Sequence, residues 1–186
     1  MSKTYNVAVV VGSLRKESIS RKAGLALARL APESLNLNIV EIGDLPLYDE
    51  DVEAEGPPAS WTRLREELRG SDAVLFVTPE YNRSVPGALK NAIDVGSRPY
   101  GSSAWEGKPA AILSLSPGAI GGFGANHHLR QSLVFLDMPL LQQPEAYVSN
   151  AYGLFDDAGA FASADTETFF QTFIDAFAKW IERTAR

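Results

Sequence analysis

Cysteine is absent from the 186-residue sequence. Its absence excludes thiol nucleophiles, cysteine phosphatase loops, C-x-x-C redox pairs and thiolate metal sites. A chain of this length that is 45% hydrophobic and 22% charged can bury a core without disulfides or metals. The compartment stays open on this ground, because a protein without thiols folds in reducing and oxidising surroundings alike.

Long apolar runs are lacking as well. No stretch approaches the roughly 20 residues needed to cross a bilayer. The first apolar run, residues 7–11, is too short for the core of a signal peptide, and no small-residue cleavage site follows it. We therefore expect a soluble, cytoplasmic protein that has no membrane partner.

The net charge of −6 argues against general nucleic-acid binding. Residues 13–22 have the opposite charge, because their four bases and one acid give a local charge of +3. The five residues are Arg15, Lys16, Arg21, Lys22 and Glu17. Such a basic island in an acidic chain indicates a small anionic ligand, although chance clustering at an exposed helix start would look similar.

Familiar catalytic signatures are missing. The stretch GSLRKESISRKAG, residues 12–24, matches neither the G-x-G-x-x-G of dinucleotide folds nor the G-x-x-x-x-G-K-[ST] of triphosphate loops. No serine lies in a G-x-S-x-G context. His127 and His128 are adjacent, so on a helix they diverge by roughly 100° and cannot bind one metal together. We expect no metal site, and an exposed or interface position for the two histidines.

Apolar runs alternate with helical patterns along the chain. Short apolar runs predict strands, and apolar residues three or four apart predict helices. The predicted strands are residues 5–11, 37–42, 73–78, 110–115 and 145–148. The predicted helices are residues 20–31, 61–69, 87–95, 125–136 and 166–183. Five such alternations favour an α/β protein with a doubly wound parallel sheet covered by helices on both faces.

One long connection does not fit this alternation. Residues 43–60 carry six acids without the regular spacing and central glycine of a calcium loop. We interpret the segment as a solvated surface loop. No repeat, linker or low-complexity tract divides the chain, so we expect a single domain over residues 1–186.

Three unusual loops are predicted to meet. In a doubly wound sheet, ligands bind beyond the carboxyl ends of the strands, where the strand order reverses. For the order 2-1-3-4-5, that point lies between the first and third strands. The loops leaving the first, third and fourth strands are the GSLRKESIS stretch, PEYNRSVP (residues 79–86) and SLSPGAIGG (residues 114–122).

The first loop is suited to a phosphate. Ser13, Ser18 and Ser20 supply hydroxyl donors, and Arg15 supplies a forked cation. A helix that begins near Ser18 adds free backbone N–H groups and the positive end of its dipole. Ser18 as a plain N-cap and Arg15 as a solvated side chain are the competing interpretations.

The other two loops are suited to a flat ligand. Prolines at both ends restrict residues 79–86 to an extended segment whose amides could face a heterocycle, with the Tyr81 ring beside it. Ser116 and Gly118 suit backbone that lies against a ligand, or a tight turn. Glu80 and Asp94 could serve as an acid pair, but Asp94 comes late in a predicted helix, beyond the loop. With no convincing acid, base or nucleophile, the crevice suits chemistry carried by a cofactor.

These residues resemble the NADPH-dependent FMN reductase family. The matching strings are GSLRKES after the first strand and TPEYNRSVPGALKNAID after the third. The similarity continues through LPLYDED (residues 45–51) and HLRQSLVFLDMPLLQQPE (residues 128–145), and weakens after about residue 148. It is strongest to the chromate/quinone reductase branch. The resemblance implies a flavodoxin-like fold, a five-stranded parallel sheet in the order 2-1-3-4-5, and noncovalently bound FMN.

The resemblance also assigns residues to FMN. The residues implied around the phosphate are Ser13, Arg15, Ser18, Ile19 and Ser20. Those implied along the isoalloxazine, largely through backbone groups, are Pro79, Glu80, Tyr81, Asn82 and Ser84, with Ser116 and Gly118 near the ring. Val95, where many relatives have Trp, and YGSSAW (residues 100–105) depart from the family pattern, and we expect both near the substrate mouth.

The resemblance further implies a homodimer or homotetramer with the flavin close to a subunit interface. Leu129, Leu133, Phe135 and Leu136 would give the helix at residues 125–136 a broad apolar surface for this contact. Packing of the same helix into the core explains these leucines equally well.

The expected function is that of an NAD(P)H oxidoreductase without a catalytic side chain. NADPH or NADH would reduce FMN, and a quinone, azo dye, nitro compound, chromate or free flavin would accept the electrons. A flavodoxin-type electron carrier is the alternative, but the first loop has Arg15 and Lys16 instead of a Thr/Ser-Gly-Thr pattern. A receiver domain would need acids after the first strand and an Asp after the third, where Ser13 and Pro79 stand.

Overall fold

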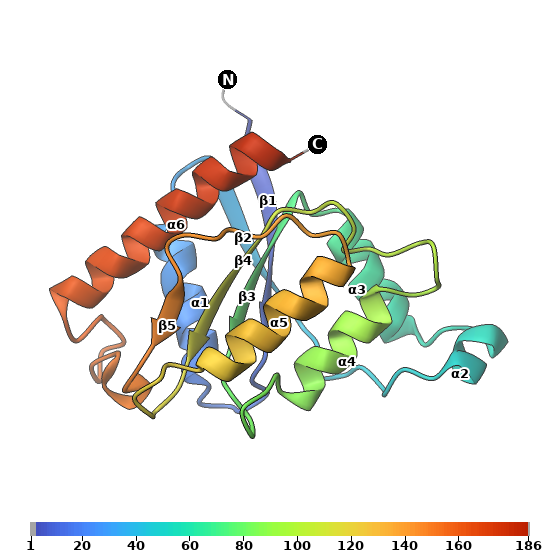
Figure 1. Cartoon of the computed structure of the whole chain (residues 1–186), viewed down its shortest axis with the longest axis horizontal. Helices are drawn as coiled ribbons and strands as arrows, with labels where there is room; N and C mark the ends of the chain where they lie inside the picture. Colours follow the sequence, from blue (N-terminus) through green and yellow to red (C-terminus); the bar gives the residue numbers. More distant parts are fainter. Residues whose placement is uncertain (1–2, 186) are drawn as a thin grey trace.

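A five-stranded parallel sheet forms the centre of the molecule. The computed structural model describes residues 3–185. The strands are β1 (Tyr5–Val11), β2 (Leu35–Val40), β3 (Ala73–Thr78), β4 (Ala110–Leu115) and β5 (Ala146–Val148). Their order is β2-β1-β3-β4-β5, and every neighbouring pair is parallel (Figure 1). This arrangement confirms the predicted doubly wound, flavodoxin-like α/β fold.

Helices cover both faces of the sheet. They are α1 (Ile19–Leu30), α2 (Glu50–Glu55), α3 (Ala59–Arg69), α4 (Gly87–Gly96), α5 (Phe123–Phe135) and α6 (Ala164–Thr184), with a short 3-10 helix η1 (Ala151–Gly153). α1 and α6 pack on one face, and α3, α4 and α5 pack on the other (Figure 1). Over residues 3–185, no helix has both the length and the apolar character that crossing a membrane requires.

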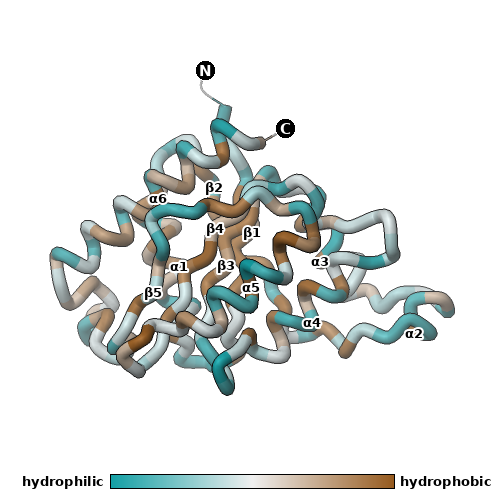
Figure 2. Tube along the Cα trace, viewed as in Figure 1, coloured by the Kyte–Doolittle hydropathy of each residue, from teal (hydrophilic) through white to brown (hydrophobic). Residues whose placement is uncertain are grey.

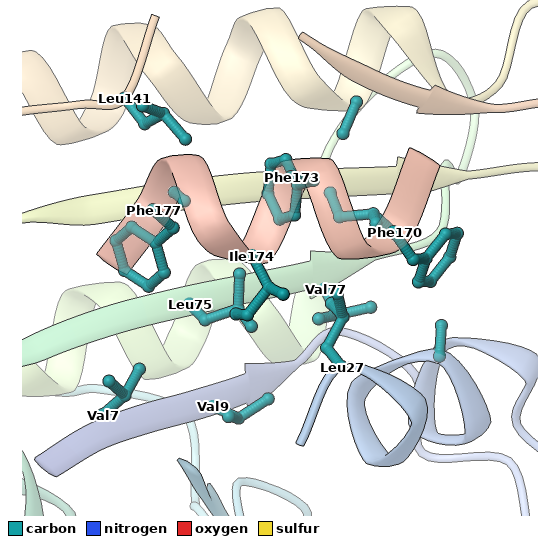
Figure 3. Packing of buried hydrophobic residues seen from close by; sticks show 14 of the residues in the cluster. Val7, Val9, Leu27, Leu75, Val77, Leu141, Phe170, Phe173, Ile174 and Phe177 are labelled. Atoms are coloured by element: carbon teal, nitrogen blue, oxygen red, sulfur yellow. The ribbon is translucent and has the colours of Figure 1, made fainter. Parts of the chain in front are cut away.

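The core consists of two apolar layers, one on each side of the sheet. Successive residues of a strand point to opposite faces, so Val9 of β1 packs under α1 and α6 while Val10 packs under α3 and α4. Figure 2 shows the central strands as hydrophobic and much of the helical exterior as hydrophilic. In Figure 3, Phe173 and Phe177 of α6 lie over the sheet. They belong to the same apolar cluster as Leu75 of β3. Burial on both faces fixes the ends of the strands and so the loops that follow them.

The second strand begins and ends two residues before its predicted limits of residues 37–42. In the sheet, Leu35 is the partner of Tyr5 and Val40 is the partner of Val10. Ile42 continues the apolar alternation beyond the ladder because it packs into the α3–α4 layer without pairing. The sequence pattern therefore placed the end of the strand at residue 42 because Ile42 is buried, although the strand pairing ends at Val40.

The acidic segment at residues 43–60 contains a helix, so its interpretation as a solvated loop is wrong for α2. The Asp49 carboxylate caps α2 by accepting the Asp51 N–H at 2.9 Å. Glu53 accepts two hydrogen bonds at 2.9 and 2.5 Å from the buried guanidinium of Arg65. The same guanidinium donates through Nε to the Val95 carbonyl at 3.0 Å, which ties α2 to α3 and α4.

Val95 and residues 100–105 lie at the edge of the sheet away from the predicted mouth. α4 starts at the carboxyl edge and runs back for 10 residues, about 15 Å, to the amino edge (Figure 1). Val95 and Trp105 are fully buried there. Trp105 donates to the Ile93 carbonyl at 3.0 Å and packs on Phe76. The expectation that these residues border the substrate mouth is therefore wrong for this fold. Val95 and Trp105 belong to the core, and Tyr100 is exposed at a surface hollow that it shares with Phe135.

The apolar surface predicted for α5 is divided between core and solvent. Leu129 and Leu133 are fully buried against the sheet, as the core-packing alternative requires. Leu136 is half-buried beside them. Phe135 and its neighbour Val134 are exposed.

Candidate functional site

Four loops meet beyond the carboxyl ends of β1, β3, β4 and β5, at the lower edge of the sheet in Figure 1. A cavity of about 250 Å³ lies between them. Its lining residues are Ser13, Arg15, Ser18, Ile19, Ser20, Pro79, Glu80, Tyr81, Leu115, Pro117, Ala151 and Tyr152. The three predicted loops thus converge, and a fourth loop, which follows β5, joins them.

The β1 loop ends in the N-terminus of α1. Ser18 is its N-cap, and its hydroxyl oxygen accepts the Arg21 N–H at 3.1 Å. The N-cap interpretation of Ser18 is thereby confirmed, and its O–H can still donate to a ligand. The N–H groups of Ile19 and Ser20 lie in the first turn, where no intrahelical carbonyl reaches them. Ser18 and Ser20 are each only 2% exposed and yet line the cavity, which gives this end a lining of buried donors.

The charges of this loop divide into paired and unpaired cations. Arg21 forms an ion pair with Glu41 at 2.6 Å, and Lys22 forms one with Glu17 at 3.2 Å. Among residues 3–185, no carboxylate lies within 4.0 Å of the Arg15 or Lys16 charge. Arg15 lines the cavity. The cavity therefore has one end at which positive charge and N–H donors are available to an anion.

The β3 loop forms a tight turn, so its prediction as an extended segment is wrong. Tyr81 and Ser84 exchange two backbone hydrogen bonds, both of 3.0 Å. Asn82 and Arg83 between them have φ values of 52° and 63°, the positive values typical of a type I′ turn. The amides of Tyr81 and Ser84 are therefore used within the turn. Pro79, Glu80 and Tyr81 line the cavity, whereas Asn82 lies at the exposed tip.

Side chains connect this turn to α5. The Glu80 carboxylate accepts the Ala125 N–H at 3.0 Å, close to a helix start whose N-cap, Gly122, has no side chain. A ring nitrogen of His128 lies 2.9 Å from the Ser84 hydroxyl. Glu80 is thus held as an anchor of α5. It does not form an acid pair with Asp94, which instead binds Lys90 at 2.7 Å.

His127 and His128 diverge, as their sequence spacing predicts. A ring nitrogen of His127 lies 3.0 Å from the Tyr147 hydroxyl, and the His127 and Phe123 rings pack with centroids 4.1 Å apart. Burial raises the pKa of Tyr147 to about 12, and the neighbouring Glu145 carboxylate contributes to the rise. This cluster joins α5 to β5, and its residues are not among those that line the cavity.

The β4 loop holds the fourth loop in place. The Ser116 carbonyl accepts the Ala151 N–H at 3.1 Å, and the Gly118 carbonyl accepts the Asn150 N–H at 3.4 Å. The Ser116 hydroxyl accepts the Gly118 N–H at 3.1 Å. These bonds position η1, which brings Ala151 and Tyr152 to the cavity.

The predicted site residues fall into two groups. The eight that line the cavity are Ser13, Arg15, Ser18, Ile19, Ser20, Pro79, Glu80 and Tyr81. The four that do not line it are Asn82, Ser84, Ser116 and Gly118. Sequence reasoning missed Leu115, Pro117, Ala151 and Tyr152. The predicted strand order contained the missing signal, because β5 lies beside β4 and the loop after it must border the same crevice.

Comparisons with known proteins agree with this geometry. A model of the family described as NADPH-dependent FMN reductase matches residues 5–153. A quinone reductase from Pseudomonas putida is 70% identical over 182 residues, which cover 98% of this chain and 97% of that protein. A 2-hydroxy-1,4-benzoquinone reductase from a Burkholderia species is 45% identical over 175 residues, covering 94% and 95%.

A solved structure is also similar. It is that of FerB, a flavoenzyme NAD(P)H:(acceptor) oxidoreductase from Paracoccus denitrificans. The TM-score is 0.92 at 43% identity, and the match covers 98% of this chain and 100% of that one.

Proposed function

The chain belongs to the NADPH-dependent FMN reductase family, and from this premise we propose that the cavity between the four loops binds FMN. The observation that supports this assignment is the division of the cavity. One end offers buried hydroxyls, helix N–H groups and Arg15, which suit a phosphate. The other end offers proline, leucine and tyrosine surfaces, which suit a flat aromatic ring.

The phosphate end involves the predicted residues of the first loop. Ser13 and Ser20 donate hydroxyl hydrogen bonds, and the N–H groups of Ile19 and Ser20 point along the helix dipole toward the anion. Ser18 closes the helix and donates its O–H. Arg15 supplies a forked, charge-assisted contact.

The ring end lies between loops from both faces of the sheet. Pro79, Glu80 and Tyr81 supply one wall, and Ala151 and Tyr152 supply another. The other four predicted residues act in this proposal through the backbone of the turn and of the β4 loop. They are Asn82, Ser84, Ser116 and Gly118. They hold the walls at the ring edge.

The reaction follows from the cofactor and the family. FMN supplies two-electron chemistry when bound, and the protein is an FMN-dependent NAD(P)H oxidoreductase that passes hydride from NAD(P)H through FMN to quinone-like acceptors. The chain contributes position: it holds the ring at the mouth of the cavity, where a second flat molecule can lie against it. Glu80 is bound to α5 and does not serve as a general acid.

Further properties belong to the same proposal. We propose that residues 1–186 act as one FMN-binding domain, because all described strands join one sheet. A cytoplasmic location is proposed from the sequence alone. We propose a homodimer or homotetramer, since Phe123, Val134 and Phe135 leave apolar surface exposed on α5. Acceptors other than quinones, such as azo dyes, nitro compounds, chromate and free flavin, are proposed from the resemblance alone.

Anaerobic addition of NADPH to the FMN-loaded protein tests this function. Loss of the oxidised-flavin absorbance within seconds, followed by its return on adding a quinone, is the expected result. A flavin that stays oxidised until a separate reductase is added would replace this function with that of a flavodoxin-type electron carrier. The first loop carries the unpaired Arg15 and Lys16 where flavodoxins have a Thr/Ser-Gly-Thr pattern. This difference favours the reductase over the electron carrier.

A further inference from the structure

A second hollow lies on the other side of the first loop. Its volume is about 270 Å³, and it opens beyond the carboxyl ends of β1 and β2. Its floor is apolar and includes the buried side chains of Val40 and Ile42. Its charged rim consists of Arg15, Arg21 and Glu41. Because Arg15 also lines the FMN cavity, a single loop separates the two hollows.

Arg21 brings a positive charge to the rim of the hollow. Arg21 lies in the first turn of α1, which contains no acidic residue. A cation there opposes the helix dipole, which favours negative charge at this end. Lys22 carries the same mismatch, but it turns to Glu17 and does not line the hollow. Glu41 holds Arg21 over the hollow at 2.6 Å and offsets its charge, so a bound phosphate would meet a cation that is already held in place.

The end of β2 offers charged groups that suit the ribose of a nucleotide. β2 lies beside β1 and parallel to it, with α1 as the crossover. In dinucleotide-binding folds, an acid at the end of the strand in this position accepts the adenosine 2′-hydroxyl, and a nearby arginine meets a 2′-phosphate. Glu41 directly follows the last residue of β2, and Arg21 is its ion-pair partner.

The FMN cavity leaves no room for the whole reductant. In the proposed function, FMN takes up this volume of about 250 Å³. When the nicotinamide reaches the flavin, the adenosine half must lie outside that cavity. We propose that the second hollow binds the adenosine ribose-phosphate end of NAD(P)H. This inference rests on the proposed function, which names NAD(P)H as the reductant.

The rim residues have separate roles in this subsite. The apolar floor packs against the adenine ring. Glu41 accepts the 2′-hydroxyl of NADH, Arg21 meets the 2′-phosphate of NADPH, and Arg15 lies between the two hollows, beside the pyrophosphate. Two variants of one ion pair should therefore change the preference for the two reductants in opposite directions.

The test uses FMN-loaded wild type, Arg21→Ala, Glu41→Gln and, as a matched control, Lys22→Ala. Stopped-flow reduction under anaerobic conditions gives second-order rate constants for NADPH and NADH. Calorimetry gives the affinity of each protein for 2′,5′-ADP and for ADP. Lys22→Ala removes the same charge from the same helical turn without touching the hollow.

We expect Arg21→Ala to lower the NADPH-to-NADH ratio of rate constants, and the affinity for 2′,5′-ADP, by about tenfold. Glu41→Gln should raise the same ratio several-fold, and Lys22→Ala should leave it unchanged. The proposal is overturned if the wild type binds neither ADP compound, or if all three variants keep the wild-type ratio. If the wild type binds no FMN, or its FMN is not reduced, the proposed function fails instead, so the two failures are distinguishable.

Discussion

Arg15 is the residue on which the phosphate assignment can be tested most directly. It lines the cavity, and no carboxylate of residues 3–185 pairs with it. A forked, charge-assisted contact to phosphate contributes about 1.5–3 kcal/mol, so Arg15→Ala should weaken FMN binding by tenfold or more. Riboflavin has no phosphate, and its affinity should hardly change. Titration of the apoprotein with each flavin measures both affinities.

Lys16→Ala is the control for Arg15→Ala. Lys16 is the neighbouring exposed cation, and it does not line the cavity, so its removal should change FMN affinity by less than about threefold. Equal losses of FMN and riboflavin affinity in Arg15→Ala would mean that Arg15 supports the fold and that the phosphate lies elsewhere.

Tyr147 should make the stability of the protein sensitive to alkaline pH. Burial raises its pKa from 10.0 to about 12, so the folded state holds the phenol proton more tightly than the unfolded state does. This contribution is complete below about pH 10 and is lost as the pH rises from 10 through 12. Urea unfolding at about pH 9 and at about pH 11 should therefore show a larger loss of stability in the wild type than in Tyr147→Phe. An identical loss in the two proteins would contradict the shift.

At the scale of the elements, Glu80 joins the β3 turn to α5. Its carboxylate is almost buried and accepts the Ala125 N–H where the helix has no capping side chain of its own. Glu80→Ala should lower the free energy of unfolding by about 1–2 kcal/mol. Glu80→Gln keeps an oxygen acceptor and should lose roughly half as much. Urea unfolding measures both variants, and hydrogen exchange at the Ala125 amide locates the change; unchanged exchange in Glu80→Ala would contradict this role.

The same contact depends on a close approach at Gly124. A Cβ at this position would lie 2.6 Å from the Arg83 carbonyl oxygen and 2.9 Å from a Glu80 oxygen. Gly124→Ala must therefore shift the turn away from the helix, and we expect a loss of about 1–3 kcal/mol in stability. Gly87→Ala is the matched control, because Gly87 also begins a helix and a Cβ there meets nothing within 4 Å. It should be neutral or stabilising by up to about 1 kcal/mol. Thermal unfolding that ranks the two variants in the reverse order would contradict the close approach.

The helices and strands that could be predicted are those whose formation depends on local sequence patterns. The strands β1, β3 and β4 are buried on both faces, so their continuous apolar runs are visible in the sequence. α2 was missed because its stability comes from tertiary contacts: Glu53 binds Arg65, which is 12 residues away, and no apolar stripe marks the helix. The turn at Asn82 and Arg83 was missed because neither residue is glycine, although both have positive φ.

The candidate site was predicted as far as local chemistry determines it. The loop with Ser18 and Ser20 at a helix start was recognisable, because an N-cap and nearby donors are features of the sequence. Tyr152 was not, because its place in the cavity depends on backbone bonds between η1 and the β4 loop. Val95 was misplaced on the family pattern, although the helix predicted at residues 87–95 starts at the loop after the third strand and so already places Val95 at its far end.

At the scale of the whole molecule, the crevice exists because the neighbouring strands β1 and β3 send their chains to opposite faces of the sheet. The chain leaves β1 and β5 toward the layer of α1 and α6, and it leaves β3 and β4 toward the layer of α4 and α5. The loops therefore separate at the carboxyl edge and leave a cavity bounded by both layers.

Assembly is the last property that this layout makes testable. The outer end of α5 exposes Val134 and Phe135, and Phe135 is 81% exposed and shares a surface hollow with Tyr100. Such apolar surface favours association of two chains, so we expect the wild type to sediment at a multiple of its 20.1 kDa mass at micromolar concentration. Phe135→Asp should weaken this association at least tenfold, because a charge would be buried at the contact. Leu25→Asp is the control, since Leu25 is also exposed but lies on α1, on the opposite face of the sheet. A wild type that sediments as a 20.1 kDa monomer would contradict the assembly, whereas dissociation of Leu25→Asp alone would place the contact on the α1 face.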